Sequence, residues 1–158
     1  MASSKARETP AFAASGCCDL SATGSAQWRP GELNYVDIPL SIQNGCATAV
    51  TGLTVILTIC GVEDITYSGS DYLPAGWTQA GKANEGLDPD GSGSGCYTLA
   101  FTSAQILAGQ GATSAQFTVK TMAYTGSGDH RPAGSIIAQV STAGCTSASV
   151  PIVLPQVG

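Results

Sequence analysis

The sequence predicts an all-β protein, an antiparallel β-sandwich of about seven to eight strands. Three observations indicate this fold. Apolar and polar residues alternate at period two over several short runs, which is the pattern of half-buried strands. Gly, Pro, Asn and Ser residues separate these runs as turns, and a helical period is almost absent. Short strands at regular spacing without intervening helices are typical of a sandwich.

The clearest alternation begins at Val36 and ends at the Asn44-Gly45 turn. In the next run Leu53 and its alternate neighbours form one apolar face, and Ile56 on the opposite face indicates partial cover there too. The alternating apolar residues of these two runs are Val36, Ile38, Leu40 and Ile42, then Leu53, Val55, Leu57 and Ile59. The other strand candidates are Leu20–Trp28, Val62–Tyr67, Tyr97–Phe101, Phe117–Tyr124, Ile136–Val140 and Val150–Leu154.

Two prolines and two segments add detail to the predicted arrangement of strands. Because proline cannot donate a ladder hydrogen bond, Pro39 predicts that its strand lies at a sheet edge or is locally bulged, and Pro151 raises the same expectation for the last strand. The segment Gly69–Gly95 has few apolar residues, so we expect a surface excursion between two strands. Only Ser103–Leu107 could form a turn of helix.

Composition excludes several classes of protein. The chain has 158 residues, of which 11% are charged and 43% hydrophobic, with 6 Lys and Arg against 11 Asp and Glu. A nucleic-acid binder needs a basic face, and a membrane helix needs about 20 consecutive apolar residues, whereas Thr54 and Thr58 interrupt the longest apolar run. We therefore expect a globular chain with neither nucleic acid nor membrane as partner, divided into an N-terminal arm, residues 1–18, and a sandwich domain, residues 19–158.

Several turn motifs occur in an order that resembles a known family. They are Asn44-Gly45 at the end of Tyr35–Gly45, then Leu53–Val55, Leu73–Trp77, Leu107–Gln110 and Phe117–Val119. This order resembles the immunoglobulin-like β-sandwich repeats of prokaryotic surface and filament proteins and of phage structural proteins, where an N-x-G turn, an LPxG(W/L) loop and an LxxGQ turn recur. The resemblance implies an immunoglobulin-like sandwich that serves as a spacer, adhesin, filament subunit or virion decoration.

Candidate catalytic residues do not assemble into a recognisable mechanism. Asp129 is adjacent to the single histidine, His130, and cannot orient its ring as the acid of a triad does, and no G-x-S-x-G elbow is present. The adjacent carboxylates Glu63 and Asp64 would point to opposite faces of a strand, so they could not flank a glycosidic bond. We expect no enzymatic activity and no cofactor.

The run Asp88-Pro89-Asp90-Gly91 is a weak candidate for calcium binding through Asp88 and Asp90. A helix–loop–helix calcium site needs a glutamate at the twelfth loop position, where Leu99 stands. A Gly- and Ser-rich loop without a metal is the alternative interpretation.

Aromatic residues are candidates for contact with a glycan. Trp77 and Tyr72 lie in the segment expected at the surface, and Trp28 and Tyr67 are further candidates. The alternative interpretation of Trp77 is that it caps the core from its loop.

The six cysteines give the sharpest chemical signal. They lack the spacing of a zinc site or of a C-x-x-C redox pair, so disulfides are the preferred interpretation and buried thiols the alternative. Six cysteines allow 15 pairings, among which the sequence does not choose. The disulfide candidates are Cys17, Cys18, Cys46, Cys60, Cys96 and Cys145.

These observations predict a non-enzymatic protein that works by assembly. The first 16 residues lack the apolar stretch of a signal peptide, so our first hypothesis is a virion subunit, a phage capsid decoration or tail-associated protein. It would form a homo-oligomer or join a capsid or filament lattice, docking residues 1–18 on a neighbour by strand addition with disulfide locking. The alternative is a secreted carbohydrate-binding or adhesion module, or an extracellular filament subunit, located outside the cell or on its surface.

Overall fold

A computed structural model describes residues 19–32, 34–62, 73–83, 96–121, 131–143 and 145–158. For residues 81–83 and 145–147 it describes the backbone alone. The strands are β2 (Leu20–Gly24), β3 (Gln27–Trp28), β4 (Tyr35–Asn44), β5 (Val50–Cys60), β6 (Trp77–Ala83), β7 (Cys96–Leu107), β8 (Ala112–Lys120), β9 (Gly134–Thr142) and β10 (Cys145–Leu154). Within the described residues no helix is long and apolar enough to cross a membrane.

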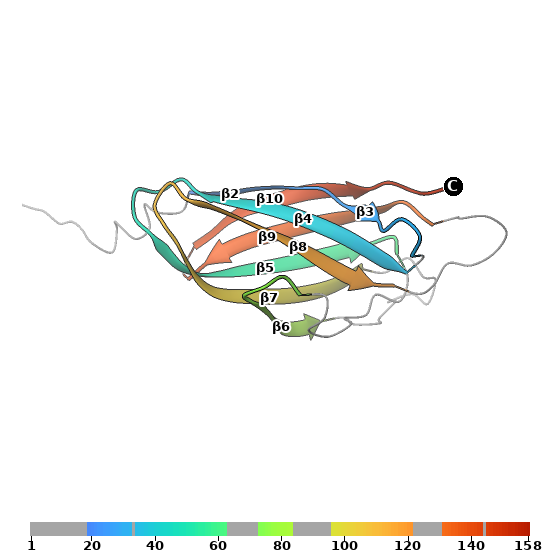
Figure 1. Cartoon of the computed structure of the whole chain (residues 1–158), viewed down its shortest axis with the longest axis horizontal. Coiled ribbons are helices and arrows are strands. Elements are labelled where there is room, and N and C mark those ends of the chain that lie inside the picture. Colours follow the sequence, from blue (N-terminus) through green and yellow to red (C-terminus); the bar gives the residue numbers. More distant parts are fainter. Residues whose placement is uncertain (1–18, 33, 63–72, 84–95, 122–130, 144) are drawn as a thin grey trace, which may run out of the picture.

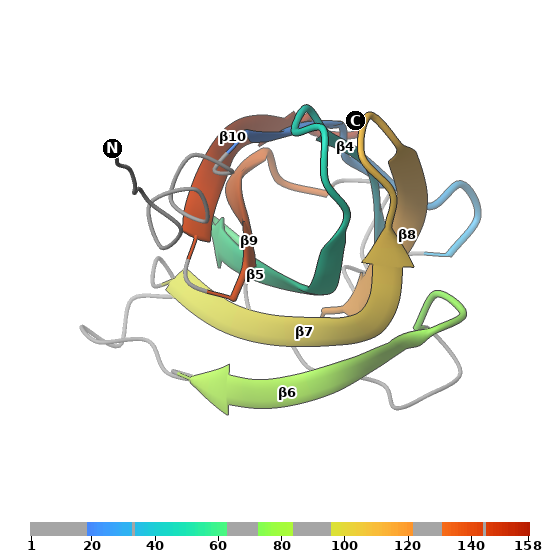
Figure 2. The same cartoon turned by 90° about the vertical axis from the view of Figure 1, so that its left-hand side faces the viewer.

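The strands form two sheets that face each other (Figure 1). The five-stranded sheet has the order β10-β9-β5-β7-β6, and in the four-stranded sheet β4 pairs with β8 on one side and with β2 and β3 on the other. Every pairing between these strands is antiparallel. Figure 2 looks along the longest axis of the molecule and shows the two sheets curving around one interior. The predicted antiparallel β-sandwich is therefore confirmed.

The core lies between the sheets and is built from the alternate residues that the sequence pattern selects. Burial of this apolar surface contributes roughly 25 cal/mol per Å² to folding, so the period-two pattern dictates which face of each strand turns inward. The largest fully buried side chains are Phe101, Phe117, Ile38, Leu40, Ile42, Leu53, Leu57, Ile59, Leu99, Ile136 and Leu154.

Pro39 does not place its strand at an edge, because β4 lies in the middle of its sheet. The backbone amide of Ser25 donates to the carbonyl oxygen of Pro39 over 3.2 Å, so Pro39 directs its backbone toward the side of β2 and β3. The neighbouring strand is interrupted there, between the end of β2 and the start of β3. The missing N–H of proline therefore meets a break in the partner strand, and no bulge in β4 is needed.

The corresponding prediction for Pro151 is correct, since β10 is an edge strand of the five-stranded sheet. Two other expectations are wrong. The segment 69–95 contains the edge strand β6, which needs few apolar residues because it has only one strand neighbour. Ser103–Leu107 extends β7 instead of forming a turn of helix, since Leu107 pairs with Val50 of β5.

Candidate functional site

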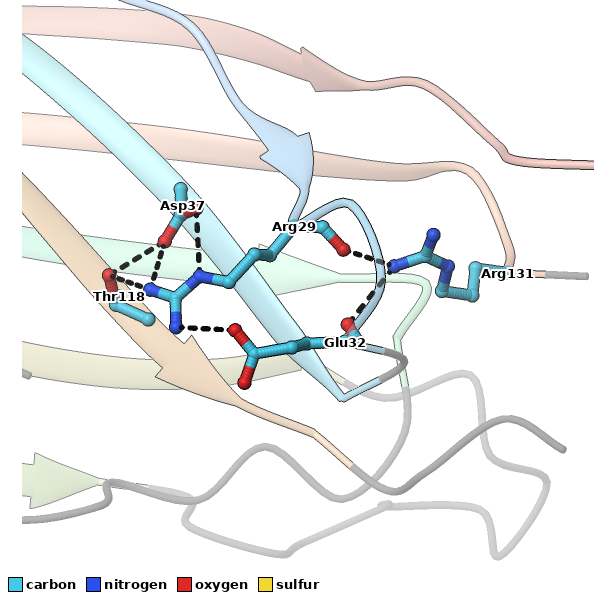
Figure 3. Close-up of polar contacts among 5 residues, drawn as sticks. All are labelled: Arg29, Glu32, Asp37, Thr118 and Arg131. Atoms are coloured by element: carbon cyan, nitrogen blue, oxygen red, sulfur yellow. Dashed lines mark hydrogen bonds and ion pairs between the residues drawn. The ribbon is translucent and has the colours of Figure 1, made fainter. Parts of the chain in front are cut away.

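The charged residues at the β3 end of the sandwich form a hydrogen-bonded cluster (Figure 3). Arg29 binds the carboxylate of Asp37 with two nitrogens, Nη2 to Oδ1 at 2.8 Å and Nε to Oδ2 at 3.2 Å. Thr118 donates its hydroxyl to the same Oδ1 at 2.8 Å, and Glu32 accepts from Arg29 Nη1 at 3.3 Å. Asp37 and Thr118 are buried. The cluster therefore joins the chain after β3 to β4 and β8.

A second arginine extends this cluster toward β9. Arg131 is buried, and its Nη1 donates to the carbonyl oxygens of Arg29 and Glu32 at 2.9 and 3.2 Å. Its guanidinium lies over the ring of Trp28, 5.5 Å from the centroid, a favourable cation–π arrangement. The indole Nε1 of Trp28 donates to the carbonyl of Pro132 at 2.9 Å.

This cluster holds strands together. The hydrogen bond that Arg29 donates to Asp37 is the main reason that the pKa of Arg29 is raised above its ordinary value, so Arg29 stays protonated. Both carboxylate oxygens of Asp37 accept hydrogen bonds from neighbouring side chains. A guanidinium and a carboxylate paired in this way fix the loop between β3 and β4, which is a structural task.

At the opposite end, Asn44 fixes the turn between β4 and β5 (Figure 1). Its side chain is fully buried, and its Nδ2 donates to the carbonyl oxygens of Thr48, Leu107 and Ala108 at 2.9 to 3.2 Å. Its Oδ1 accepts from the amide of Cys46 at 2.9 Å. One amide side chain thus satisfies backbone groups of two connections that are far apart in sequence.

Gln110 completes the same junction from the turn between β7 and β8. It adopts a positive φ of 62°, which is uncommon for a residue other than glycine, and its Nε2 donates to the carbonyls of Gly45 and Cys46 at 2.7 and 3.2 Å. Gly109 lies so close to the carbonyl oxygen of Ala47 that a side chain there would collide with it. The Asn44-Gly45 turn and the Leu107–Gln110 turn therefore interlock in space, which gives the residues of both turns a structural reason.

The LPxGW motif also has a structural role. The amide of Trp77 donates to the carbonyl of Pro74 at 3.1 Å, and Gly76 has a positive φ of 86°, as the third residue of a type II turn requires. The turn directs Trp77 into the core, where only 5% of it is exposed and its ring meets Phe117 edge-on at 5.2 Å. Trp77 therefore caps the core and offers no free face to a sugar, and Trp28 is buried to the same degree.

Cys60 and Cys96 form a disulfide between the end of β5 and the start of β7, where they are direct partners in the strand register. The bond closes a connection of 36 residues. Cys46 is buried beside the Asn44 turn. The backbone of Cys145 begins β10, but its side chain is outside the description.

The remaining candidates lie outside the described residues. They are Cys17, Cys18, Tyr67, Tyr72, Asp88, Asp90 and His130, together with the arm, residues 1–18. In the part of the chain that is described, no three His, Cys, Asp or Glu side chains gather as a metal site requires.

The feature left over after these structural roles is the outer face of the five-stranded sheet. Hydroxyl side chains form a row across four neighbouring strands, which we call the hydroxyl row: Ser141, Thr54, Thr102 and Thr78 are consecutive partners in the register. The hydroxyls of Thr78 and Thr102 lie 3.1 Å apart. A second pair, Thr58 and Thr98, follows further along the same face.

Beside the hydroxyl row lies an aliphatic patch, made by Ile56, Ile137, Pro151 and Val153 on β5, β9 and β10. Val153 is 74% exposed and Ile137 48%, and with Ile106 on the same face they are the exposed large hydrophobic side chains of the described residues. The strands β5, β7, β9 and β10 contain no Asp, Glu, Lys or Arg. These four strands therefore present an uncharged surface with exposed aliphatic groups, a kind of surface that often marks a binding site.

Sequence reasoning missed this face because, apart from Ile56, it read the strands for their buried side. The signal was present, since threonine recurs among the residues that alternate with the core positions of β5 and β7, and no charged residue interrupts these strands.

No known protein family matches the sequence, and no curated protein matches it either. Solved structures similar to it include a collagen adhesin from S. aureus, with a TM-score of 0.41 and 11% identity over 84% of this chain and 48% of that chain. This chain thus spans about half the length of that adhesin.

Two further solved structures are similar at the same level. A collagen-binding domain from a Staphylococcus aureus adhesin has a TM-score of 0.40 and 14% identity over 85% of this chain and 95% of that chain. The major pilin SpaD from Corynebacterium diphtheriae has a TM-score of 0.43 and 10% identity over 86% of this chain and 35% of that chain. At TM-scores this low the likenesses bear on neither the activity nor the partner of this chain.

Proposed function

We propose that this chain is a non-enzymatic adhesion module that works outside the cell or on its surface. It binds an uncharged, hydroxyl-rich polymer, a neutral polysaccharide, through the outer face of the five-stranded sheet. The observation that carries the proposal is the composition of that face, where the hydroxyl row lies beside the aliphatic patch and the four strands β5, β7, β9 and β10 are without charge.

The chemistry of the face matches such a polymer in two ways. Hydroxyls on neighbouring strands repeat at roughly 4.7–4.9 Å, and each can both donate and accept a hydrogen bond, as sugar hydroxyls do. The aliphatic patch can cover the C–H faces of sugar rings. Because no charged side chain on these strands must lose its hydration, contact with a neutral surface avoids the largest desolvation penalty.

The charged cluster supports the non-enzymatic part of the proposal. Arg29, Asp37 and Arg131 are engaged in bonds that join β3, β4, β8 and the start of β9. A general acid or base must reach a substrate proton, and these groups are directed at one another and at backbone carbonyls. Their arrangement serves the fold, so the binding face is the better candidate for function.

The sequence also predicts a narrower role, a phage capsid-decoration or tail-associated subunit that docks by its arm. That role depends on residues 1–18, which lie outside the described residues. The sheet face supports adhesion without them, and adhesion is therefore the function we propose.

The test is depletion of the purified protein from solution by insoluble neutral polysaccharides, namely cellulose, chitin and starch granules. The substitution Thr102→Lys places an ammonium group in the middle of the hydroxyl row. The matched control is Thr23→Lys, an exposed position on the outer face of the other sheet. We expect the wild type and the control to be retained by at least one polymer, and Thr102→Lys to bind at least about tenfold more weakly, which is about 1.4 kcal/mol.

Two outcomes would contradict the proposal. One is that none of the three polymers retains the wild-type protein. The other is that Thr102→Lys is retained as well as the wild type while thermal unfolding shows both to be folded.

A further inference from the structure

β8 is an edge strand, with β4 as its neighbour among the described strands, and it lies at the margin of the sandwich in Figure 2. The amide of Asn44 in β4 donates across this pair to the carbonyl of Gly111, so the even-numbered residues of β4 direct their backbone toward β8. Their register partners in β8 are Thr113, Ala115, Phe117 and Val119. In an antiparallel pair the intervening residues direct their backbone groups away from the partner.

The outward backbone groups of β8 therefore belong to Ala112, Ser114, Gln116 and Thr118. Each presents an N–H and a C=O along the free edge. The side chains of Ala112, Ser114 and Gln116 are exposed and carry no charge. Such an edge is a template on which another strand can be added.

The other edges carry features that block strand addition, and the stretch of β8 from Ala112 to Val119 does not. β10 contains Pro151 and a register shift between Thr146 and Ala148, and β6 has a register shift between Gln79 and Gly81. On the fourth edge, β2 and β3 are separated by a break. Bulges, prolines and breaks are the usual protection of an exposed edge. β8 pairs with β4 in unbroken register from Ala112 to Lys120 and has no proline.

We propose that β8 is a self-association edge, at which the β8 strand of a second copy of this chain pairs antiparallel across a two-fold axis. The pairing would join the two four-stranded sheets into one. A second copy is the occupant that fits, because residues Ala112 to Val119 carry no charge, so two such edges meet without the like-charge repulsion that opposes direct cross-strand pairs.

The alternation of buried and exposed residues fixes the register of this pairing. A two-fold axis at Ala115 places Thr113 opposite Phe117 of the partner subunit, so that core-facing side chains meet on one side. On the other side Ser114 lies opposite Gln116 of the partner subunit, and the two can exchange hydrogen bonds. Ala115 meets its own copy at the axis, where a small side chain allows the strands to approach.

This inference goes beyond the proposed adhesion function, since it uses a different sheet and a different partner. It also has a consequence for adhesion. A dimer joined at β8 leaves the outer faces of both five-stranded sheets free, and two linked binding faces hold one polymer more tightly than either face alone.

The main test is Gln116→Pro. It removes one outward N–H and leaves the ladder with β4 intact, since Gln116 lies opposite Pro39 in a pair that shares no hydrogen bond on that side. The matched control is Ser149→Pro on the edge strand β10, two residues before Pro151. Sedimentation velocity from micromolar to millimolar concentration should show a wild-type dimer, an unchanged dimer for Ser149→Pro, and a dissociation constant at least about tenfold higher for Gln116→Pro.

A wild type that remains monomeric over this range overturns the proposal, and so does a Gln116→Pro variant that dimerises like the wild type. If Gln116→Pro fails to fold, the double variant Ser114→Lys with Gln116→Lys replaces it. It gathers four ammonium groups at the two-fold axis, so we expect a monomer at low salt and partial recovery of the dimer at high salt. A dimer that persists at low salt in this variant also overturns the proposal.

The polysaccharide assay keeps the two proposals separate. A monomeric Gln116→Pro variant that is still retained by the polymer, more weakly than the dimer, supports both. A dimer that no polymer retains counts against the adhesion function alone.

Discussion

The two ends of the sandwich are fastened by different chemistry. At the β4–β5 end, the neutral amides of Asn44 and Gln110 bind backbone carbonyls of two interlocked turns. At the other end, Arg29 and Arg131 bind a carboxylate and backbone carbonyls, and the disulfide closes the same end, since Cys60 is a register partner of Ser135 near the start of β9. Neutral hydrogen bonds fix the geometry of one end, and charge and a covalent bond fix the other.

The difference predicts how each end responds to solution conditions. The pKa of Arg29 is raised, mainly by its hydrogen bond to Asp37. A raised pKa in the folded state gives a contribution to stability that is complete below the ordinary arginine pKa and is lost only as the pH rises above it. The arginine therefore adds no pH dependence near neutrality. Salt weakens the ion pair only partly, because the Asp37 side chain is only 10% exposed.

Removal of the disulfide should have the largest effect on stability. For a closed connection of 36 residues, the loop-entropy relation gives a loss of about 4 kcal/mol when Cys60 and Cys96 are both replaced by alanine. Urea unfolding measures the loss. The control is Thr58→Ala with Thr98→Ala, the next outward pair in the same register, which removes contacts without removing a bond. Equal losses in the two double variants would mean that packing rather than the covalent link stabilises this end.

Substitution of Asn44 should have the next largest effect on stability, and it disrupts the end of the sandwich that neutral hydrogen bonds hold. The substitution Asn44→Ala leaves buried carbonyls and the Cys46 amide without their partner, at a cost of about 3 kcal/mol in urea unfolding. Asn44→Asp has the same shape but turns a carboxylate oxygen toward three carbonyls, so it should destabilise at least as much. The neighbouring exposed residue provides the control, Gln43→Ala, with little effect. A stable Asn44→Asp variant would contradict the assigned bonding.

Loss of Asp37 should be the smallest of the three effects. Asp37→Ala breaks a two-nitrogen ion pair whose Arg29 side chain is 25% exposed, so solvent compensates part of the loss, and we expect about 2 kcal/mol. The difference between this variant and the wild type should shrink at high salt, whereas that for Asn44→Ala should not. Glu32→Ala, at an exposed pair, should cost about 0.5 kcal/mol or less. A salt response shared by Asn44→Ala and Asp37→Ala would remove the contrast between the two ends.

Much of the fold follows from the alternation in the sequence, because one-sided burial sets the face of each strand. Ile38, Leu57 and Ile136 are buried as that pattern requires. The sequence did not predict β6, because an edge strand buries few side chains and its apolar and polar residues therefore alternate only weakly. The sequence did not predict that β4 lies in the middle of its sheet. The break between β2 and β3, which accommodates Pro39, is a property of the neighbouring strand.

The proposed binding face was harder to predict than the fold. A threonine such as Thr102 is a common strand residue, and its meaning depends on which residues of β5 and β6 stand beside it. That register is a long-range property. Trp77 shows the opposite case, since the sequence allowed both a surface aromatic and a cap on the core, and the turn at Gly76 delivers its ring to the core.

The interlocked turns also constrain the order in which the chain can fold. The side chain of Asn44 needs the carbonyl oxygens of Leu107 and Ala108, 63 and 64 residues further on. The β4–β5 turn therefore cannot complete its set of native bonds until the chain has been synthesised past the β7–β8 turn. Contacts between residues so far apart in the sequence slow folding. The apolar faces of the first strands therefore stay uncovered until the second half of the chain has been made.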